Sequence, residues 1–229
     1  MWPSLAKKAR VGEICLLRQP TLRIAVSGAH SLGKSTFVND WVATHKGMTR
    51  EEEPYRALGL NGPYEILFRD QSNRLHNGIQ LYYNISRVLR YTNPADQVIF
   101  DRAPADFIAY SQYTADCGTT DIDDSFVSTL VEPVRESFRC LDLIVFVPKT
   151  ECAPVAMEDD GIRPVDHDYR DAVDGIFKQM YREDRYGLMS DQNAVQLIEL
   201  WGNPTERIDK LEAVIAAMTG QTAQSSARS

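Results

Sequence analysis

The stretch "LRIAVSGAHSLGKSTF", residues 22–37, decides how this chain folds. It opens with a short, nearly continuous apolar run, which is typical of a strand covered on both faces of a parallel sheet. The residues after the run fill every fixed position of the pattern GxxxxGK[ST]: Gly28, Gly33, Lys34 and Ser35. A helical pattern over 33–45 follows. The motif therefore has a strand before it and a helix after it, which is the context that a phosphate-binding loop requires.

Each residue type in this loop has a physical reason. Glycine lets the backbone turn tightly and point its N–H groups at phosphate oxygens, and the following helix adds free donors and a partial positive charge. We expect Lys34 to reach the β- and γ-phosphates and Ser35 to bind Mg²⁺, so ATP and Mg²⁺ are the predicted cofactors. The predicted nucleotide-binding residues are Gly28, Ala29, His30, Ser31, Leu32, Gly33, Lys34, Ser35 and Thr36. His30 stands where the pattern is free, which favours a spacer role.

The rest of the chain predicts a doubly wound α/β fold. Further strand-like runs cover 97–100, 142–147 and 195–200, and helical patterns cover 79–90, 123–138, 171–182 and 206–218. We expect Pro133 to kink or interrupt the second of these helices. Strands that alternate with helices predict a parallel β-sheet with helices on both faces. We divide the chain into an N-terminal extension (1–20), one domain (21–219) with a lid at about 150–170, and a disordered tail (220–229).

Composition narrows the function classes. The 229 residues are 43% apolar and 25% charged, as in an ordinary globular protein, and no run is long enough to span a membrane. A net charge of −7 disfavours a broad nucleic-acid-binding surface. Four scattered cysteines form no CxxC pair, which favours reduced thiols and a cytoplasmic location. The oligomeric state stays open, with a homodimer as one option.

A second site is predicted at "VIFDRAPADFIAY", residues 98–110. Asp101 ends an apolar strand, and ligands of open α/β sheets gather at the carboxyl ends of strands. This acid is suited to hold Mg²⁺ through water or to accept a proton from an attacking hydroxyl. Arg102 is suited to bind an anionic acceptor or the moving phosphoryl group. The alternative is a surface ion pair of these two residues. We interpret Asp106 as a cap of the next helix.

Together, GAHSLGKST and DRAPADFIAY resemble the P-loop kinases of the nucleoside and nucleotide kinase group. This group includes thymidylate kinases, deoxynucleoside kinases and nicotinamide-riboside-kinase-like ATPases. The resemblance covers roughly residues 22 to 210 and implies a P-loop kinase fold. It also implies that Asp101 acts as a base or supports the metal, and that Arg102 contacts the acceptor. These motifs are shared across the group, so they do not name a substrate.

The resemblance implies further site residues. In "TREEEPYRALG", residues 49–59, it places Glu53 and Arg56 against the acceptor; the alternative is an acidic solvated loop. Gln80 matches a helix position that reads a base edge, or is simply exposed. Arg163 and Arg170 match lid arginines that stabilise the transition state, or belong to an ordinary charged loop whose helix Asp168 or Asp171 caps. Asn203 and Pro204 match the loop beside the adenine; Thr205 fits either that loop or a helix N-cap equally well.

Three functions follow from these residues. The first is an ATP- and Mg²⁺-dependent kinase acting on a hydroxyl or phosphate of a nucleoside- or nucleotide-like small molecule. The second is an ATPase or regulatory switch without an acceptor; a guanine-reading NKxD stretch is absent, which disfavours GTP. The third is a kinase that acts on a modified base in DNA. Four arginines at positions 69, 74, 87 and 90 support this last alternative, unless they form a solvated helix face.

Overall fold

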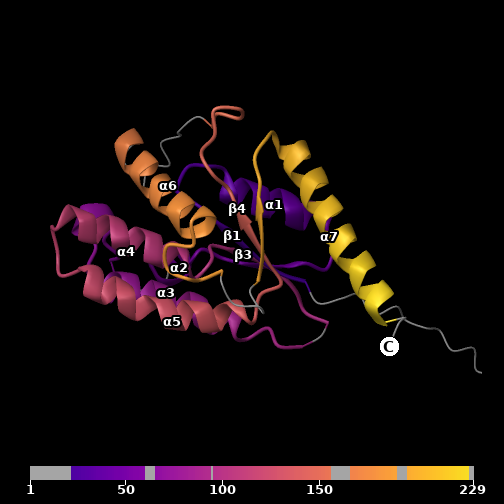
Figure 1. The fold of residues 1–229 in the computed structure, drawn as a ribbon, viewed down its shortest axis with the longest axis horizontal. Coiled ribbons are helices and arrows are strands. Elements are labelled where there is room, and N and C mark those ends of the chain that lie inside the picture. The colour runs from indigo at the N-terminus through magenta and orange to yellow at the C-terminus, as the bar shows by residue number, and fades with distance from the viewer. Residues whose placement is uncertain (1–21, 60–64, 94, 156–165, 190–194, 227–229) are drawn as a thin grey trace, which may run out of the picture.

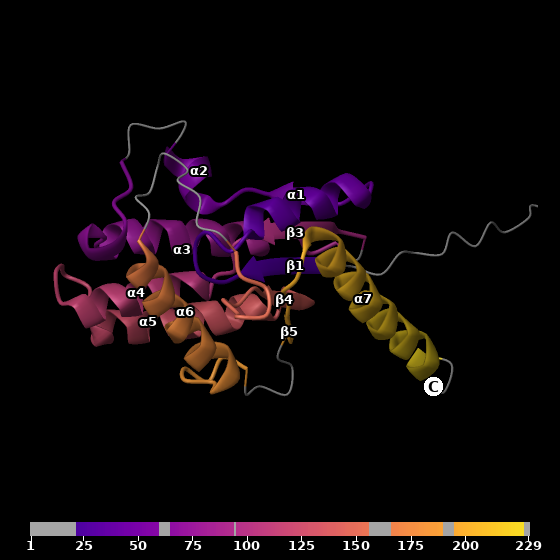
Figure 2. The ribbon, with the colours of Figure 1, turned by 90° about the horizontal axis from the view of Figure 1, so that it is seen from above.

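The computed structural model describes residues 22–59, 65–93, 95–155, 166–189 and 195–226. Its centre is one five-stranded sheet in which every pairing is parallel, with the strand order β2–β3–β1–β4–β5. The strands are β1 (Leu22–Ser27), β2 (Thr49–Glu51), β3 (Gln97–Asp101), β4 (Leu143–Phe146) and β5 (Gln196–Glu199). Figure 2 shows β3, β1, β4 and β5 side by side in this order. The predicted doubly wound sheet is thereby confirmed.

The register brings the predicted motifs to one edge of the sheet. Ile24 of β1 lies opposite Ile99 of β3 and Leu143 of β4, and all three side chains are fully buried. Continuous apolar runs therefore fill the sheet centre, because helices cover both of its faces. Further along, Val26 pairs with Asp101. The loop that follows β1 and the acid that ends β3 are consequently neighbours.

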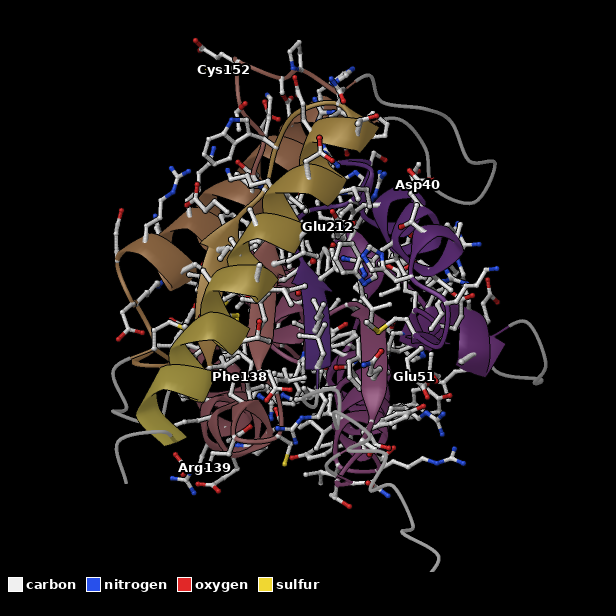
Figure 3. The ribbon with its side chains drawn as sticks, turned by 90° about the vertical axis from the view of Figure 1, so that its right-hand side faces the viewer. Asp40, Glu51, Phe138, Arg139, Cys152 and Glu212 are labelled. Atoms are coloured by element: carbon white, nitrogen blue, oxygen red, sulfur yellow. The ribbon has the colours of Figure 1, made fainter. Side chains whose placement is uncertain are left out.

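Helices complete the two outer layers. They are α1 (Lys34–Thr44), α2 (Pro54–Gly59), α3 (Arg74–Val88), α4 (Asp106–Cys117), α5 (Asp124–Phe138), α6 (His167–Arg182) and α7 (Pro204–Ser226), with a short 3₁₀ helix at Arg69–Gln71. Figure 1 shows α1 and α7 on one side of the strands and α3, α4 and α5 on the other. In Figure 3, Asp40 marks α1 and Glu212 marks α7, two neighbouring helices that a His45–Glu212 contact of 3.1 Å links.

Helix boundaries differ from the sequence predictions at several places. α3 begins five residues before the predicted range, because the Asn73 side chain accepts from the His76 amide and caps the helix. α5 continues through Pro133 without a break, since a buried stripe from Val127 to Phe138 anchors its other face. α7 runs to Ser226, so most of the predicted disordered tail is helical; residues 221–226 contain neither Gly nor Pro.

Among the described residues, no helix combines the length and the apolar character that a bilayer span requires. The predicted N-terminal extension (1–20) lies outside the described residues, as do residues 156–165 of the predicted lid.

Candidate functional site

The loop between β1 and α1 is a tight, glycine-dependent turn. Gly28 has φ +136°, and a Cβ at this position would lie 2.5 Å from the carbonyl oxygen of Val147. Gly33 is left-handed, with φ +77°, immediately before α1. A side chain at Gly28 would therefore push the loop away from β4, while the positive φ values require residues without a Cβ penalty. The backbone geometry matches the phosphate-loop prediction at both glycines.

Lys34 lies under this loop rather than in solvent. Its side chain is buried, and Nζ donates to the carbonyl oxygen of Ala29 at 2.5 Å. Burial, with the nearby Arg102 charge, lowers the pKa of Lys34 to about 7, against the opposing carboxylates of Asp106, Glu53 and Asp101. The three carboxylates therefore do not offset the cost of burying the ammonium.

Arg102 is the connection between the phosphate loop and the rest of the site. It is buried, has φ +114°, and is held by four acceptors. Its Nε donates to Glu53 at 2.8 Å, and its Nη1 donates to Asp106 (3.1 Å), to the Tyr110 hydroxyl (2.6 Å) and to the carbonyl oxygen of Gly28 (3.2 Å). Burial opposes the charge, but Glu53, Tyr110 and Asp106 outweigh it and raise the pKa of Arg102 well above its ordinary value. The guanidinium therefore stays charged while it touches the loop.

A pocket opens on the other side of Arg102. Glu53, Gln80 and Arg102, which the sequence resemblance placed at the acceptor, all line it. The further lining residues are Phe68, Arg69, Ser72, Asn77, Phe107, Tyr110, Thr114 and Tyr169. Two amides, one carboxylate and several aromatic rings are suited to a planar ligand with polar edges. The enclosed volume is about 40 Å³, so a ligand has to displace side chains on entry.

Tyr169 of α6 joins the pocket to the phosphate loop. Its ring stacks on His30 with centroids 4.8 Å apart, and the Arg69 guanidinium lies 4.9 Å from its centroid. Arg69 also pairs with Asp166, which caps α6 by accepting from the Tyr169 amide. His30 is thus more than the spacer that the sequence predicts. Sequence reasoning missed Tyr169 because its partners are distant along the chain.

Several predicted residues lie elsewhere. Arg56 is 3.7 Å from Glu53 but does not line the pocket. Arg170 is buried on α6, where it contacts the carbonyl oxygen of Val155 and Asp171. Arg163 lies outside the described residues.

The predicted cap role of Asp106 is wrong. Asp106 is the first residue of α4 and caps nothing; it is fully buried, accepts from Ser27 Oγ at 2.5 Å and from Arg102. Ser27 in turn contacts the Tyr181 hydroxyl at 2.7 Å. Burial raises the pKa of Asp106, with Arg102 and Lys34 opposing it. The four-residue spacing from Arg102 was the available sequence signal, since it places both side chains on one side of the turn.

A second hollow lies between the phosphate loop and α7. Its volume is about 350 Å³, and its walls include Gly33, Thr36, Val155, Asn203, Pro204 and Arg207. Asn203 caps the helix, so the alternative that Thr205 is the cap is wrong. Its side chain accepts from the Glu206 amide at 3.0 Å, while Glu206 accepts from the Asn203 amide at 2.9 Å. This reciprocal pair is a capping box, and Pro204 occupies the first helical position.

Two oxygen groups are available for Mg²⁺. Asp101 is buried; its Oδ2 accepts from Arg50 at 3.3 Å, and its Oδ1 has no hydrogen-bond partner within the described residues. The Ser35 side chain stands at the start of α1. Within the described ranges, no group of three or more His, Cys, Asp or Glu side chains forms a metal cluster. This donor set fits Mg²⁺, which usually completes its shell with phosphates and water.

The arginines that supported a DNA partner are partly neutralised. Arg69 pairs with Asp166, Arg74 with Asp123, and Arg87 with Glu51. Such pairs leave less free positive charge for a nucleic-acid backbone. Three of the four arginines are thus paired within the described residues, which weakens the support for this alternative.

Comparison with known proteins places the chain in a family and in a fold group. The profile of a family described as an AAA domain matches residues 23–197, which contain the phosphate loop, the Asp101–Arg102 pair and the acceptor pocket. No curated protein matches the sequence.

Similar solved structures share the fold. NadR in complex with NR has a TM-score of 0.57 at 17% identity, and NadR in complex with NAD and AMP-PNP has 0.55 at 16%. Both matches cover 86% of this chain but only 52% and 50% of NadR, so the chain spans about half the length of those proteins. Deoxyadenosine kinase from M. mycoides, with dcmp and dcdp, has a TM-score of 0.58 at 14% identity. That match covers 86% of this chain and 100% of the kinase. The expected P-loop kinase fold is confirmed.

Proposed function

We propose that this chain, which belongs to the AAA domain family, is a kinase that transfers the γ-phosphoryl group of ATP to a nucleoside- or nucleotide-like small molecule. One observation carries the proposal. The buried guanidinium of Arg102 donates to the carbonyl oxygen of Gly28 in the phosphate loop. It also lines the separate pocket that contains Glu53 and Gln80. A switch that only hydrolyses ATP has no need of a second ligand pocket at this point.

The proposed roles follow from position. The loop from Gly28 to Thr36 binds the ATP phosphates, with Lys34 as the buried cation. Arg102 orients the acceptor and stabilises the charge on the moving phosphoryl group. Glu53 is the carboxylate that lines the acceptor pocket, so we propose that it accepts the proton of the acceptor hydroxyl. Asp101 lies outside that pocket lining.

Ser35 and Asp101 are the residues that would hold Mg²⁺. When bound, this ion neutralises part of the phosphate charge. The hollow beside Asn203 and Pro204 is the proposed place of the adenine. We propose that Gln80 presents its amide to a base edge of the acceptor, while Ser72 and Ser111 hold the amide of Asn77 at the pocket wall. We also propose that Arg56 supports Glu53 from outside the pocket.

Arg163 and Arg170 remain the proposed lid cations. We propose a cytoplasmic location, which agrees with the free thiols of Cys117, Cys140 and Cys152.

The neighbours support this substrate class. NR and NAD are bound by NadR, and dcmp and dcdp by deoxyadenosine kinase. All four are nucleosides or nucleotides. Their ligand class is what the amides and aromatic rings of the acceptor pocket suit.

The test is a transfer assay with ATP labelled in its γ-phosphate. The wild-type protein and Lys34→Ala are incubated with Mg²⁺ and with separate panels of nucleosides, nucleotides and oligonucleotides. We expect labelled product from a small molecule with the wild type and none with Lys34→Ala, which should still fold. Label released only as inorganic phosphate, at a rate that no acceptor changes, would favour the ATPase switch. Label on an oligonucleotide alone would favour the DNA reading.

A further inference from the structure

A buried arginine on α7, Arg207, has no counter-ion among the described residues. Arg207 is 6% exposed. Its Nε donates to the carbonyl oxygen of Gly202 at 3.0 Å, and its Nη1 donates to the carbonyl oxygen of Leu32 at 3.1 Å. Leu32 belongs to the phosphate loop, and a Cβ on Gly33 would lie 3.2 Å from the same Nη1. The guanidinium therefore lies directly against the turn that leads into α1.

No acidic side chain in the described part of the chain compensates the charge of Arg207. Both of its acceptors are neutral carbonyls, and within the described ranges no carboxylate forms an ion pair with it. Burial alone lowers the pKa of Arg207, with no acidic group opposing it. Arg102, in contrast, is buried beside the carboxylates of Glu53 and Asp106. A buried cation without an anion is costly, and none of the described residues supplies one, so a phosphate of a bound ligand is suited to this position.

The cavity beside Arg207 indicates which anion fits. The hollow of about 350 Å³ is lined on one side by Gly33 and Thr36 of the phosphate loop and on the other by Asn203 and Pro204. This volume is within the usual range for small-molecule sites. Arg207 lies at the junction, where a nucleotide would pass from its phosphates to its base.

We propose that Arg207 binds a phosphate oxygen of the nucleotide, as a second buried cation on the side of the phosphate loop that faces α7. The inference rests on the proposed function, since both need a nucleotide in this loop. It adds a residue that lies outside the loop motif and ties α7 to nucleotide binding. An arginine can donate two parallel hydrogen bonds to a phosphate. The contacts to Gly202 and Leu32 involve only Nε and Nη1 of Arg207, so further N–H groups remain for a phosphate.

The test compares Arg207→Met with the wild type and with a matched control. The control is Arg182→Met on α6, where the arginine pairs with Glu199 near the surface. Calorimetric titrations use ADP and inorganic pyrophosphate in magnesium buffer, and melting curves are recorded without ligand. We expect Arg207→Met to weaken both ligands about tenfold or more. We also expect its ligand-free melting temperature to stay equal to or above that of the wild type, and the control to bind as the wild type does.

Three results would overturn the inference. Unchanged ADP affinity would remove Arg207 from the nucleotide site. Weaker ADP with unchanged pyrophosphate would place the guanidinium on the base instead. A lower ligand-free melting temperature together with weaker binding would show that Arg207 serves to stabilise the loop through the carbonyl oxygen of Leu32.

A second variant and the binding of the wild type complete the test. If Arg207→Met does not fold, Arg207→Gln retains donors for the carbonyls without the charge, and the same outcomes apply. A wild type that binds neither ADP nor pyrophosphate would end the proposed function and this inference together, whereas normal wild-type binding with an unchanged variant would end only the inference.

Discussion

At the scale of single residues, Arg102 is the most constrained side chain in the site. It has a positive φ, which is uncommon for a residue with a Cβ, and it is surrounded by Glu53, Asp106 and Tyr110. Strained backbone of this kind persists only where surrounding contacts hold it in place. Lys34 and Arg102 are both buried, and the sequence motifs indicated both residues but neither their burial nor the partners that hold them.

We predict that Arg102→Lys lowers phosphoryl transfer by about 100-fold or more while ADP affinity changes little. A lysine keeps one positive charge but loses the fork that holds Glu53 and Asp106 at once, so the charge is no longer positioned for transfer. Steady-state rates and ADP titrations measure the two effects separately. Arg74→Lys, in an exposed pair with Asp123, is the control. Equal losses of transfer and ADP affinity would show that Arg102 serves nucleotide binding instead.

At the scale of elements, the strands were predictable from their apolar runs, whereas the start of α3 was not. β1 matches its apolar run from Leu22 to Ser27, because a buried parallel strand is apolar on both faces. α3 begins at the Asn73 cap, five residues before its apolar pattern, and its first turns bury the polar residues Asn77 and Gln80. Asn77 and Gln80 line the acceptor pocket. The periodicity argument fails here because the inner face of the helix carries polar side chains that are satisfied by Ser72, Ser111 and the His76 carbonyl oxygen.

The second element that sequence reasoning misjudged is α7. Its range was read from apolar spacing, which misses the cap at Asn203 and the buried Arg207 beyond it. A buried arginine that contacts only carbonyls has no signature in a single sequence, because its partners, Leu32 and Gly202, offer backbone atoms.

For the start of α7, we predict that Asn203→Ala lowers the free energy of unfolding by about 1 kcal/mol, whereas Asn203→Asp lowers it much less. The alanine removes the oxygen that accepts from the Glu206 amide, and aspartate supplies an equivalent oxygen. Denaturant titration of both variants measures the difference. Equal stability of the two variants would mean that the capping box contributes nothing to the folded state.

At the scale of the whole molecule, charges of both signs are buried where the phosphate loop meets the end of β3. Lys34 and Arg102 lie there beside the carboxylates of Glu53, Asp101 and Asp106. The chain carries a net charge of −7, yet Lys34, Arg102, Arg170 and Arg207 are all buried. Arg102 is neutralised by carboxylates, while Lys34 retains a pKa of about 7 despite them. The folded protein therefore maintains an unfavourable cation in its phosphate loop, and the free energy of that cation becomes available when an anion binds. Binding and stability are linked through the same group.

This linkage gives a pH dependence with a definite sign. The pKa of Lys34 is about 7 when folded and near its ordinary value of 10.5 when unfolded, so the unfolded chain binds more protons between these values. Stability contributed by this residue therefore rises with pH across that window, by about 2 kcal/mol from pH 7 to pH 9, and the penalty is fully present below pH 7. Denaturant titrations of the wild type and Lys34→Met at both pH values isolate the effect, because the variant lacks the titrating group. We expect the free energy of unfolding of the wild type to increase relative to that of Lys34→Met as pH rises. A constant difference between them would show that the ammonium keeps its ordinary pKa, and a saturating concentration of ADP should abolish the gain by holding Lys34 charged.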